Sequence, residues 1–316
     1  MATIQAVVVA PDAAGRLALA EVDAPELATN EALVQVAAIS LNRGEVRNAQ
    51  TAAAGFRPGW DLAGTVSRAA ADGSEPAPGT RVVGTLRAGA WAETVAVPTR
   101  SLAVLPAGVS FAQAATLPIA GLTAQFALAK YGGSLLGRTI LVTGASGGAG
   151  NFAVQLATLA GARVVGLVRK PQDSAAVRAA GAAEVAVGED GSAAAALGPY
   201  DLIVDSVGGA VLGDALSLLA PDGACVSFGT TAGERVTFDA RRFYGTGGLR
   251  FYGLIVFHEL EREPATVGLA RLAGLVANGR LRPPIEVEAP WAEVGTVAQR
   301  LLDRGYTGKA VLPVGS

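Results

Sequence analysis

The sequence predicts an α/β protein in which a β-rich domain accompanies a doubly wound parallel sheet. Three observations lead to this fold class. Short β-branched runs continue to about Val97, apolar strands alternate with helical segments from Thr139, and a loop of small residues follows the first of those strands. Such alternation is typical of parallel sheets with helices on their faces. The 316 residues allow one large domain or two smaller ones that share a cleft.

The first region, from Gln5 to about Val97, indicates a β-rich, barrel-like domain. Its strand-like runs are separated by turn clusters, and they read AVVVA, ALVQVAAI, AGTVSRA, RVVGT and AETVAV. Short strands at this spacing are typical of small all-β domains. The next run, FAQAATLPIAGLTAQFALAKYGG, starts at Phe111 and predicts a helix that ends at Gly132 and Gly133. This helix bridges to the second region.

The second region predicts the parallel sheet. Its strands read TILVTG, RVVGLV, EVAV, YDLIVDSVGG and ACVSFG, and between them stand the helical segments NFAVQLATLAGA, DSAAVRAAGA and VLGDALSLLA. A further strand, FYGLIVF, is expected before a helix near 263–278. The last segment, 281–314, returns to short strands and a helix, WAEVGTVAQRLLDRG. We expect it to rejoin the first region.

Composition narrows the classes of partner. Hydrophobic residues make up 51% of the chain and charged residues 16%, with a mean hydropathy of +0.39, but much of this is alanine and no window reaches the roughly 18 uninterrupted apolar residues of a membrane span. A net charge of −2 without a basic run argues against nucleic acid or a membrane surface as partner. The start of the chain lacks a signal-peptide pattern and Cys225 is the only cysteine, so a cytoplasmic location and a small-molecule partner are expected.

The loop after the strand TILVTG resembles a dinucleotide fingerprint with alanine in the first glycine position. Glycine at 147 lets the backbone approach a pyrophosphate, and glycine at 150 lets the helix pack close to the strand. Free N–H groups at the helix start would supply the anion site. The alternative is a purely structural turn, but the strand-to-helix context favours the cofactor. The residues expected to contact it are Ser146, Gly147, Gly148, Ala149 and Gly150.

The strand RVVGLV ends in Arg169 and Lys170, about 20 residues after the glycines, where an NAD-selective protein would carry an acidic residue. Two cations suit the 2′-phosphate of NADPH, so NADPH is the expected cofactor. The alternative is a solvated basic loop.

An ordered set of motifs extends over nearly the whole chain. Besides the fingerprint, it consists of GWDLAG at 59–64, GAWAETVAVP at 89–98, LPIAGLTA at 117–124, DSVGG at 205–209 and GKAVL at 308–312. With these motifs the chain resembles the medium-chain dehydrogenase/reductase family, and most of all its zinc-free quinone oxidoreductase (zeta-crystallin-like) and enoyl reductase branch. The resemblance implies a GroES-like substrate domain at 1–123 and 266–316, and a Rossmann NADP-binding domain at 124–265.

The resemblance also implies site residues. Asn42 and Thr123 would contact the nicotinamide and donate hydrogen bonds to the acceptor oxygen, although a turn Asn and a capping Thr are the plain alternatives. Several relatives carry a tyrosine in place of Arg47, which leaves Arg47, Glu45 or water as the proton donor. A tyrosine that touches the 2′-phosphate is replaced by Gly188. Further cofactor contacts are implied for Ser206, Val207, Phe228, Gly229, Leu254, Ile255, Val256 and Lys309, and core strands are the alternative for several of them.

No metal site is expected, because a catalytic zinc needs about three His, Cys or carboxylate ligands and the chain has one His and one Cys. We expect His258 to be structural or solvated and Cys225 to be a buried hydrophobe. Trp60 and Trp91 would line the substrate pocket or pack in the first domain.

These observations predict an NADPH-dependent oxidoreductase that transfers hydride to a quinone or an α,β-unsaturated carbonyl compound without zinc. The alternatives are a biosynthetic enoyl or carbonyl reductase acting on one intermediate, and a non-catalytic NADPH-binding protein in the manner of a crystallin. The apolar segment from Val236 to Phe257 is expected to form a sheet edge, and such edges need a cover. A homodimer is therefore expected.

Overall fold

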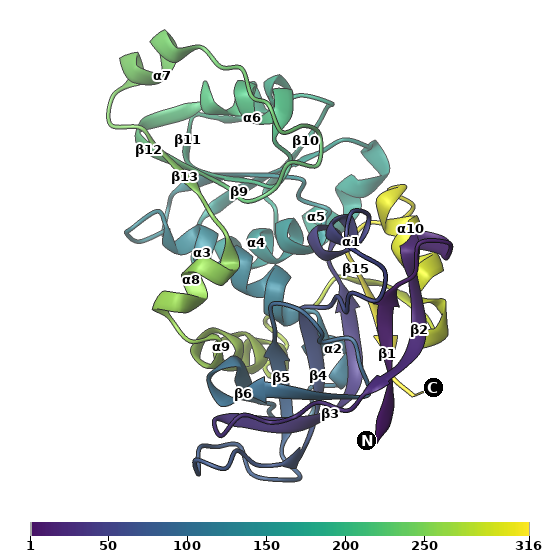
Figure 1. Ribbon diagram of the computed structural model, residues 1–316. Coiled ribbons are helices and arrows are strands. Elements are labelled where there is room, and N and C mark those ends of the chain that lie inside the picture. The colour runs from purple at the N-terminus through teal and green to yellow at the C-terminus, as the bar shows by residue number, and fades with distance from the viewer. Residues whose placement is uncertain (1, 316) are drawn as a thin grey trace. The chain divides into compact units, whose positions relative to one another are not determined.

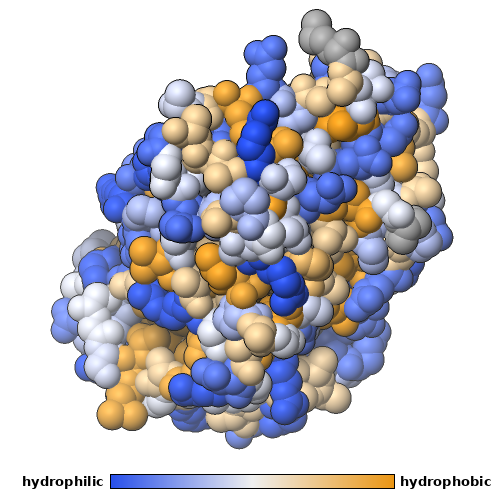
Figure 2. Space-filling model, turned by 90° about the horizontal axis from the view of Figure 1, so that it is seen from below, coloured by the Kyte–Doolittle hydropathy of each residue, from blue (hydrophilic) through white to orange (hydrophobic). Residues whose placement is uncertain are grey.

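The computed structural model describes residues 2–315, which fold into two units (Figure 1). The first unit contains residues 2–122 and 260–315, and the second contains 123–259. The boundaries expected from the sequence lie at 123/124 and 265/266. None of the helices in the described part of the chain has the length and apolar character needed to cross a bilayer. Figure 2 shows one face, where hydrophobic residues form patches interrupted by hydrophilic ones.

The first unit contains two sheets. A seven-stranded sheet has the order β14-β15-β3-β4-β5-β7, with β6 also paired to β3, and a separate hairpin pairs β1 with β2. The last strand, β15, runs antiparallel to β3, so the end of the chain does rejoin the first region. The strands are β1 (Thr3–Val9), β2 (Leu17–Asp23), β3 (Glu31–Leu41), β4 (Asp61–Arg68), β5 (Arg81–Thr85), β6 (Thr94–Pro98), β7 (Leu102–Val104), β14 (Ile285–Glu288) and β15 (Lys309–Pro313).

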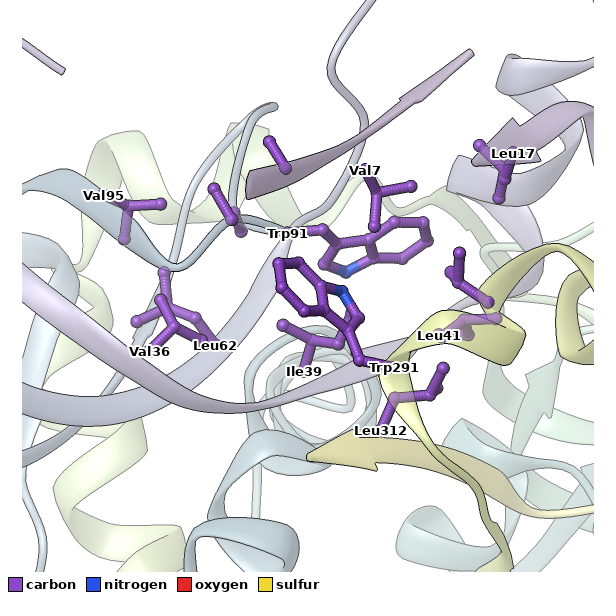
Figure 3. Close-up of a cluster of buried hydrophobic side chains, with 14 of the residues drawn as sticks. Val7, Leu17, Val36, Ile39, Leu41, Leu62, Trp91, Val95, Trp291 and Leu312 are labelled. Carbon is purple, nitrogen blue, oxygen red and sulfur yellow. The ribbon is translucent and has the colours of Figure 1, made fainter. Parts of the chain in front are cut away.

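The core of the first unit gathers apolar side chains from both ends of the chain. Figure 3 shows the indoles of Trp91 and Trp291 facing one another, with Val7, Ile39 and Leu312 around them. Both tryptophans are buried, so Trp91 is a packing residue, as one of the two sequence interpretations had it. Burying a large apolar side chain contributes about 1.5 to 3 kcal/mol, so this cluster helps to hold the late segment 287–312 against the early strands.

The second unit contains a six-stranded sheet in which every pairing is parallel. Its order is β10-β9-β8-β11-β12-β13, so the chain makes two crossovers outward from β8, to β9 and β10, and two outward from β11, to β12 and β13. Successive strand residues such as Ile140 and Leu141 point to opposite faces of the sheet and are both buried, so both faces are covered there, as a parallel sheet requires. The strands are β8 (Thr139–Thr143), β9 (Arg163–Val168), β10 (Glu184–Val187), β11 (Tyr200–Asp205), β12 (Leu219–Ser227) and β13 (Arg250–Gly253). The predicted doubly wound sheet is thereby confirmed.

The helices occupy the segments between these strands. The α-helices are α1 (Arg43–Ala49), α2 (Phe111–Ala115), α3 (Leu122–Ala129), α4 (Gly148–Leu159), α5 (Ser174–Ala179), α6 (Gly209–Leu216), α7 (Ala240–Thr246), α8 (Val256–Arg262), α9 (Ala265–Ala277) and α10 (Val294–Leu302); η3 (Leu117–Gly121) is a π-helix. Short 3₁₀ turns are η1 (Ala14–Arg16), η2 (Thr99–Ser101), η4 (Pro171–Asp173), η5 (Gly191–Leu197) and η6 (Trp291–Glu293).

Three local expectations were wrong. The single helix expected from Phe111 is divided into α2, a π-helical turn and α3, and Pro118 lies in that turn because it has no N–H to continue the α-helical ladder. The strand expected over FYGLIVF is confined to β13, which ends at Gly253, where its partner β12 also ends, and α8 begins at Val256. The segment VTF at 236–238 forms no strand, so β13 alone makes this sheet edge.

Candidate active site

Five segments of the second unit meet at the carboxyl edge of its parallel sheet. Strands β9, β8, β11, β12 and β13 are consecutive neighbours, and their registers bring their last residues to the same edge. Crossovers diverge between β8 and β11, which makes this position a topological switch point, where open α/β sheets bind their ligands. The predicted contacts of Ser146–Gly150, Arg169–Lys170, Ser206–Val207, Phe228–Gly229 and Leu254–Val256 follow these strand ends.

The loop between β8 and α4 contains two glycines, Gly144 and Gly150, at which a Cβ would lie less than 3 Å from another atom. Gly144 has φ +59°, and a Cβ there would lie 2.5 Å from Ser206 Oγ. A Cβ on Gly150 would lie 2.2 Å from the carbonyl oxygen of Gly144, so the helix starts in direct backbone contact with the strand end. The close packing expected of Gly150 is therefore present. Gly147 is the N-cap of the 12-residue α4, and no side chain caps it.

The uncapped start of α4 fits an anion. The first N–H groups of a helix have no intrahelical partner, and they carry the positive end of the helix dipole. Because neither a capping side chain nor a Cβ at Gly147 covers them, the phosphates of a dinucleotide can approach these groups.

Asp205 joins three strand ends at this edge. Its buried carboxylate accepts hydrogen bonds from Thr143 Oγ1 at 2.7 Å and Ser227 Oγ at 2.9 Å, and from the backbone N–H groups of Val207 and Gly208 at 3.2 Å. Burial raises the pKa of Asp205, and these hydrogen bonds oppose that rise. The carboxylate thus fixes the turn that carries Ser206 and Val207. Sequence reasoning missed Asp205, although an acid closing an apolar strand was a visible signal.

Arg169 and Lys170 directly follow β9 and are exposed. They stand beside the glycine loop, because Leu167 of β9 pairs with Thr143 at the end of β8. Ser146 belongs to the same glycine loop, and its hydroxyl donates a long hydrogen bond of 3.5 Å to Asp173 Oδ2. Gly188, which follows β10, donates its N–H to Val168 and offers no side chain to a phosphate.

The remaining predicted contacts differ in exposure. Phe228 and Gly229 are half-buried, and a Cβ on Gly229 would lie 2.5 Å from the carbonyl oxygen of Ser206. Leu254 and Val256 are buried, whereas Ile255 is 67% exposed between them. Of this triplet only Ile255 therefore has a side chain on the surface of its unit.

The first unit holds a buried polar network around Asn42, which caps the start of α1. Lys309 Nζ donates to Asn42 Oδ1 at 2.6 Å, to the Leu41 carbonyl at 2.9 Å and to Asp61 Oδ2 at 3.2 Å. The Asn42 amide donates to Asp61 Oδ2 at 2.7 Å and to Glu45 Oε1 at 3.0 Å. Asp61, Lys309 and Glu45 are all buried. Every donor of Lys309 and both amide hydrogens of Asn42 are used, which fixes the orientation of the amide.

The network contains two carboxyl groups and one cation. Burial and the neighbouring charge of Asp61 raise the pKa of Glu45 well above its usual range, and the charge of Lys309 lowers it only in part. Burial likewise raises the pKa of Asp61, against the opposing effect of Lys309. Each carboxyl group also accepts a hydrogen bond from a backbone N–H group. Trp60 donates to Glu45 Oε2 at 2.7 Å, and Ile119 donates to Asp61 Oδ1 at 2.9 Å. We call Asn42, Glu45, Asp61 and Lys309 the Asn42 network.

The structure changes the expected roles of several residues. Because both amide hydrogens of Asn42 are given to carboxylates, Asn42 donates to an acceptor oxygen only if one of these bonds opens. Thr123 is buried near the start of α3, whereas Arg47 is exposed on α1. Cys225 is buried inside β12, where burial raises its pKa, and His258 is exposed on α8.

Within the described residues, no group of three or more His, Cys, Asp or Glu side chains is arranged to hold a metal ion. Asp61 was the chief omission of the sequence reasoning. The motifs GWDLAG and GKAVL each carry a charged residue among apolar ones, which was a signal that Asp61 and Lys309 are buried but not that they pair.

Comparisons with known proteins agree with this geometry. Residues 148–271 match the family model "zinc-binding dehydrogenase", and residues 28–107 match "alcohol dehydrogenase GroES-like domain". A quinone oxidoreductase from Pseudomonas aeruginosa is 30% identical over 231 residues, which are 71% of each protein. The spectinabilin polyketide synthase system protein NorB from Streptomyces orinoci is 35% identical over 269 residues; these cover 82% of this chain but only 12% of NorB. A mycobacterial protein solved in complex with NADPH has a TM-score of 0.87 and 25% identity, over 98% of this chain and 99% of the other.

Proposed function

Because this chain belongs to the medium-chain dehydrogenase/reductase family and is similar to its quinone oxidoreductases, we propose that it is an NADPH-dependent reductase. It transfers hydride to a quinone or an α,β-unsaturated carbonyl acceptor, and it does so without zinc. One observation carries this proposal: the glycine loop, its uncapped helix and the basic pair Arg169–Lys170 stand side by side at the switch point of the parallel sheet.

Each part of this edge has a role in holding the cofactor. The backbone N–H groups of Gly148 to Gly150 bind the diphosphate, and Arg169 and Lys170 bind the 2′-phosphate with charge-assisted hydrogen bonds. Asp205 holds the turn of Ser206 and Val207 in place for the remainder of the dinucleotide. When bound, NADPH supplies the hydride from the C4 position of its nicotinamide.

The first unit supplies the acceptor side. The Asn42 network keeps the Asn42 amide in one orientation, so that its dipole is fixed before the acceptor binds. Thr123, the first residue of the second unit, contributes a hydroxyl, and a proton follows from solvent or from Arg47 or Glu45. The chain has one His and one Cys, too few for the usual ligand set of a catalytic zinc, so an already activated acceptor suits this protein better than a simple alcohol.

The test is NADPH oxidation with a panel of simple quinones and enones, followed at the absorbance of reduced nicotinamide. We expect turnover with several members of the panel and a preference for NADPH over NADH. Tight NADPH binding by calorimetry without oxidation by any acceptor would instead favour the non-catalytic alternative.

A second candidate is a biosynthetic enoyl reductase that acts on one thioester intermediate. The similarity to NorB, a polyketide synthase system protein, favours it. Comparing kcat/KM for a quinone and for an enoyl thioester separates the two: a ratio strongly in favour of the thioester would select the biosynthetic role. A carbonyl reductase would reduce a ketone instead.

We also propose a homodimer that pairs through β13. This strand is the edge of the six-stranded sheet, and Phe251 on it is 53% exposed. Pairing two such edges would extend the sheet and cover both. Light scattering at micromolar concentration should give twice the 31.6 kDa of one chain; the mass of a single chain would refute the dimer.

A further inference from the structure

Three polar side chains join α8 to β13 and to the end of α3 inside the second unit. Lys130, which follows α3, places its Nζ 2.6 Å from Glu259 Oε2 on α8. The hydroxyl of Tyr252 on β13 donates to Glu259 Oε1 at 2.5 Å, and Lys130 Nζ lies 4.6 Å from the centroid of the Tyr252 ring. We call Lys130, Tyr252 and Glu259 the Glu259 cluster.

The three members of the cluster depend on one another. Only 4% of the Glu259 side chain is exposed, and a carboxylate removed from water is stable only when it is paired and hydrogen-bonded. Burial opposes the charge of Lys130, but Glu259 and Tyr252 outweigh this effect and raise the pKa of Lys130. The ammonium is therefore charged at neutral pH, and the cluster holds the first turns of α8 to β13 and to the end of α3.

The helix turn that carries Glu259 also holds Ile255. The backbone N–H groups of His258 and Glu259 donate to the Ile255 carbonyl oxygen at 2.9 and 3.3 Å. On the other side, the N–H of Leu254 donates to the carbonyl oxygen of Ser227, the last residue of β12, at 2.8 Å. The backbone of Ile255 is thus fixed between β12 and α8, whereas its side chain is 67% exposed.

The proposed function decides which half of the dinucleotide extends toward Ile255. It assigns the 2′-phosphate, which belongs to the adenosine half, to Arg169 and Lys170 after β9, and the diphosphate to the start of α4. The nicotinamide half then extends to the other side of the switch point, along the ends of β11, β12 and β13. Three strand spacings of about 4.8 Å separate β8 from β13. Ile255 follows β13 at this edge and offers an apolar surface to an aromatic ring.

We propose that the Glu259 cluster positions the Ile255 side chain against the nicotinamide ring of the bound cofactor. Lys130, Tyr252 and Glu259 are positioning residues, because they act through the turn that begins α8 and not by touching the cofactor. Releasing Glu259 would displace Ile255 and weaken the hold on the nicotinamide, but it would leave the adenosine half as it is. This inference rests on the proposed function, from which it takes the place of the 2′-phosphate.

The test compares two ligands by calorimetry: NADPH, and 2′-phospho-ADP-ribose, which has the same adenosine half and diphosphate but no nicotinamide. In Tyr252→Phe and in Lys130→Met, we expect the Kd for NADPH to rise about three- to tenfold and the Kd for 2′-phospho-ADP-ribose to stay unchanged. Lys130→Arg keeps the charge and should restore the wild-type ratio of the two constants. The matched control is Tyr244→Phe, since this tyrosine on α7 is 72% exposed, and it should change neither constant.

A double variant tests whether the effect passes through Ile255. Ile255→Ala should itself weaken NADPH binding selectively, and adding Tyr252→Phe should cause little further loss, because the contact that the cluster positions is already gone. Losses that add in the double variant would overturn this route.

Two further outcomes separate this inference from the proposed function. If wild type binds both ligands, and Tyr252→Phe and Lys130→Met keep the wild-type ratio of the two constants, the inference alone is overturned. This includes the case in which both variants bind both ligands equally more weakly, as a merely structural role of the cluster would require. Wild type that binds neither ligand would overturn the proposed function and this inference with it.

Discussion

Two regions of the molecule, one in each unit, are built in opposite ways. The Asn42 network of the first unit consists of side chains from residues far apart in the sequence, and it works only when two carboxyl groups, an amide and one ammonium are all present. The edge of the second unit to which we assign the cofactor consists mainly of backbone, and its geometry depends on the absence of side chains at Gly144 and Gly150. A side-chain network is damaged by removing a group, and a backbone cradle is damaged by adding one.

The largest effect is expected from removing the ammonium of the network. Lys309→Met leaves the buried carboxyl groups of Asp61 and Glu45 without a cation, and breaking a buried ion pair in this way costs about 3 to 5 kcal/mol. Urea unfolding at neutral pH measures the change. Lys170→Met is the control, because this lysine is exposed and should change the free energy of unfolding by less than about 0.5 kcal/mol. Equal stability of the two variants would show that the network is not a unit.

The opposite operation is to add a methyl group to the segment 144–150, from the end of β8 into the start of α4, which we call the cradle. In Gly150→Ala the new Cβ would lie 2.2 Å from the carbonyl oxygen of Gly144, so backbone has to move. We expect a loss of about 3 kcal/mol or less in stability, as for overpacked cores, and loss of NADPH binding as α4 shifts. The control Gly274→Ala adds a Cβ in α9 where nothing lies within 4 Å, and it should be neutral or stabilising. Intact NADPH affinity in Gly150→Ala would contradict the cradle.

Removing the two positive charges beside the cradle, Arg169 and Lys170, should have a smaller effect that is selective for NADPH. Replacing Arg169 and Lys170 by serine should weaken NADPH binding about ten- to a hundredfold, since each charge-assisted contact is worth roughly 1.5 to 3 kcal/mol before screening at this exposed position. NADH has no 2′-phosphate, so its affinity should barely change. If the double variant keeps the original preference for NADPH, the pair is only a solvated loop. Arg178→Ser, an exposed arginine on α5, is the control.

The smallest effect is a pH dependence that comes from one carboxyl group of the network. Burial and Asp61 raise the pKa of Glu45, so the folded protein holds this proton more tightly than the unfolded chain does. The stability gained from that proton is present below the pKa of an unfolded glutamate, about 4.3, and is lost as the pH rises through the folded value. Wild type should therefore lose stability relative to Glu45→Gln as the pH rises from 4 to 8.

Asp72 provides the opposite sign in the same unit. Hydrogen bonds from Ser74 lower the pKa of Asp72 in the folded protein. The ionised Asp72 therefore stabilises the fold above the pKa of an unfolded aspartate, and this stabilisation is lost as the pH falls through the folded pKa. Relative to Asp72→Asn, wild type should gain stability with rising pH. Both series are followed by urea unfolding across the pH range. Two slopes of the same sign would contradict the assigned causes.

The cradle could be predicted from the sequence because its determinants are local. A strand, a run of small residues and a helix follow one another within 139–159. The positive φ of Gly144 and the 2.2 Å distance between a Cβ at position 150 and the Gly144 carbonyl oxygen both arise within this segment. The place of the basic pair beside this loop could be predicted for the same reason, since a parallel sheet puts the end of each strand at one edge, and its contact with a 2′-phosphate stays a prediction.

The network could not be predicted in the same way. No spacing rule links Asn42 and Asp61 to a lysine 267 and 248 residues away, and their contact appears only when β15 pairs with β3. Periodicity also failed where the backbone changed type. The segment 111–129 keeps a helical pattern through a π-turn at Pro118, and the apolar run after Arg250 changes from strand to helix at Val256 with no polar residue to mark the change.

The position of Lys309 has a consequence for the order in which the protein is made. At about 5 to 20 residues per second, a ribosome adds this lysine roughly 12 to 50 s after Asp61, and the entire second unit is synthesised in between. Throughout that interval the nascent first unit holds two acids whose cation does not yet exist, so its sheet cannot close around them without penalty. The second unit can therefore complete its sheet while the first still waits for its final strand.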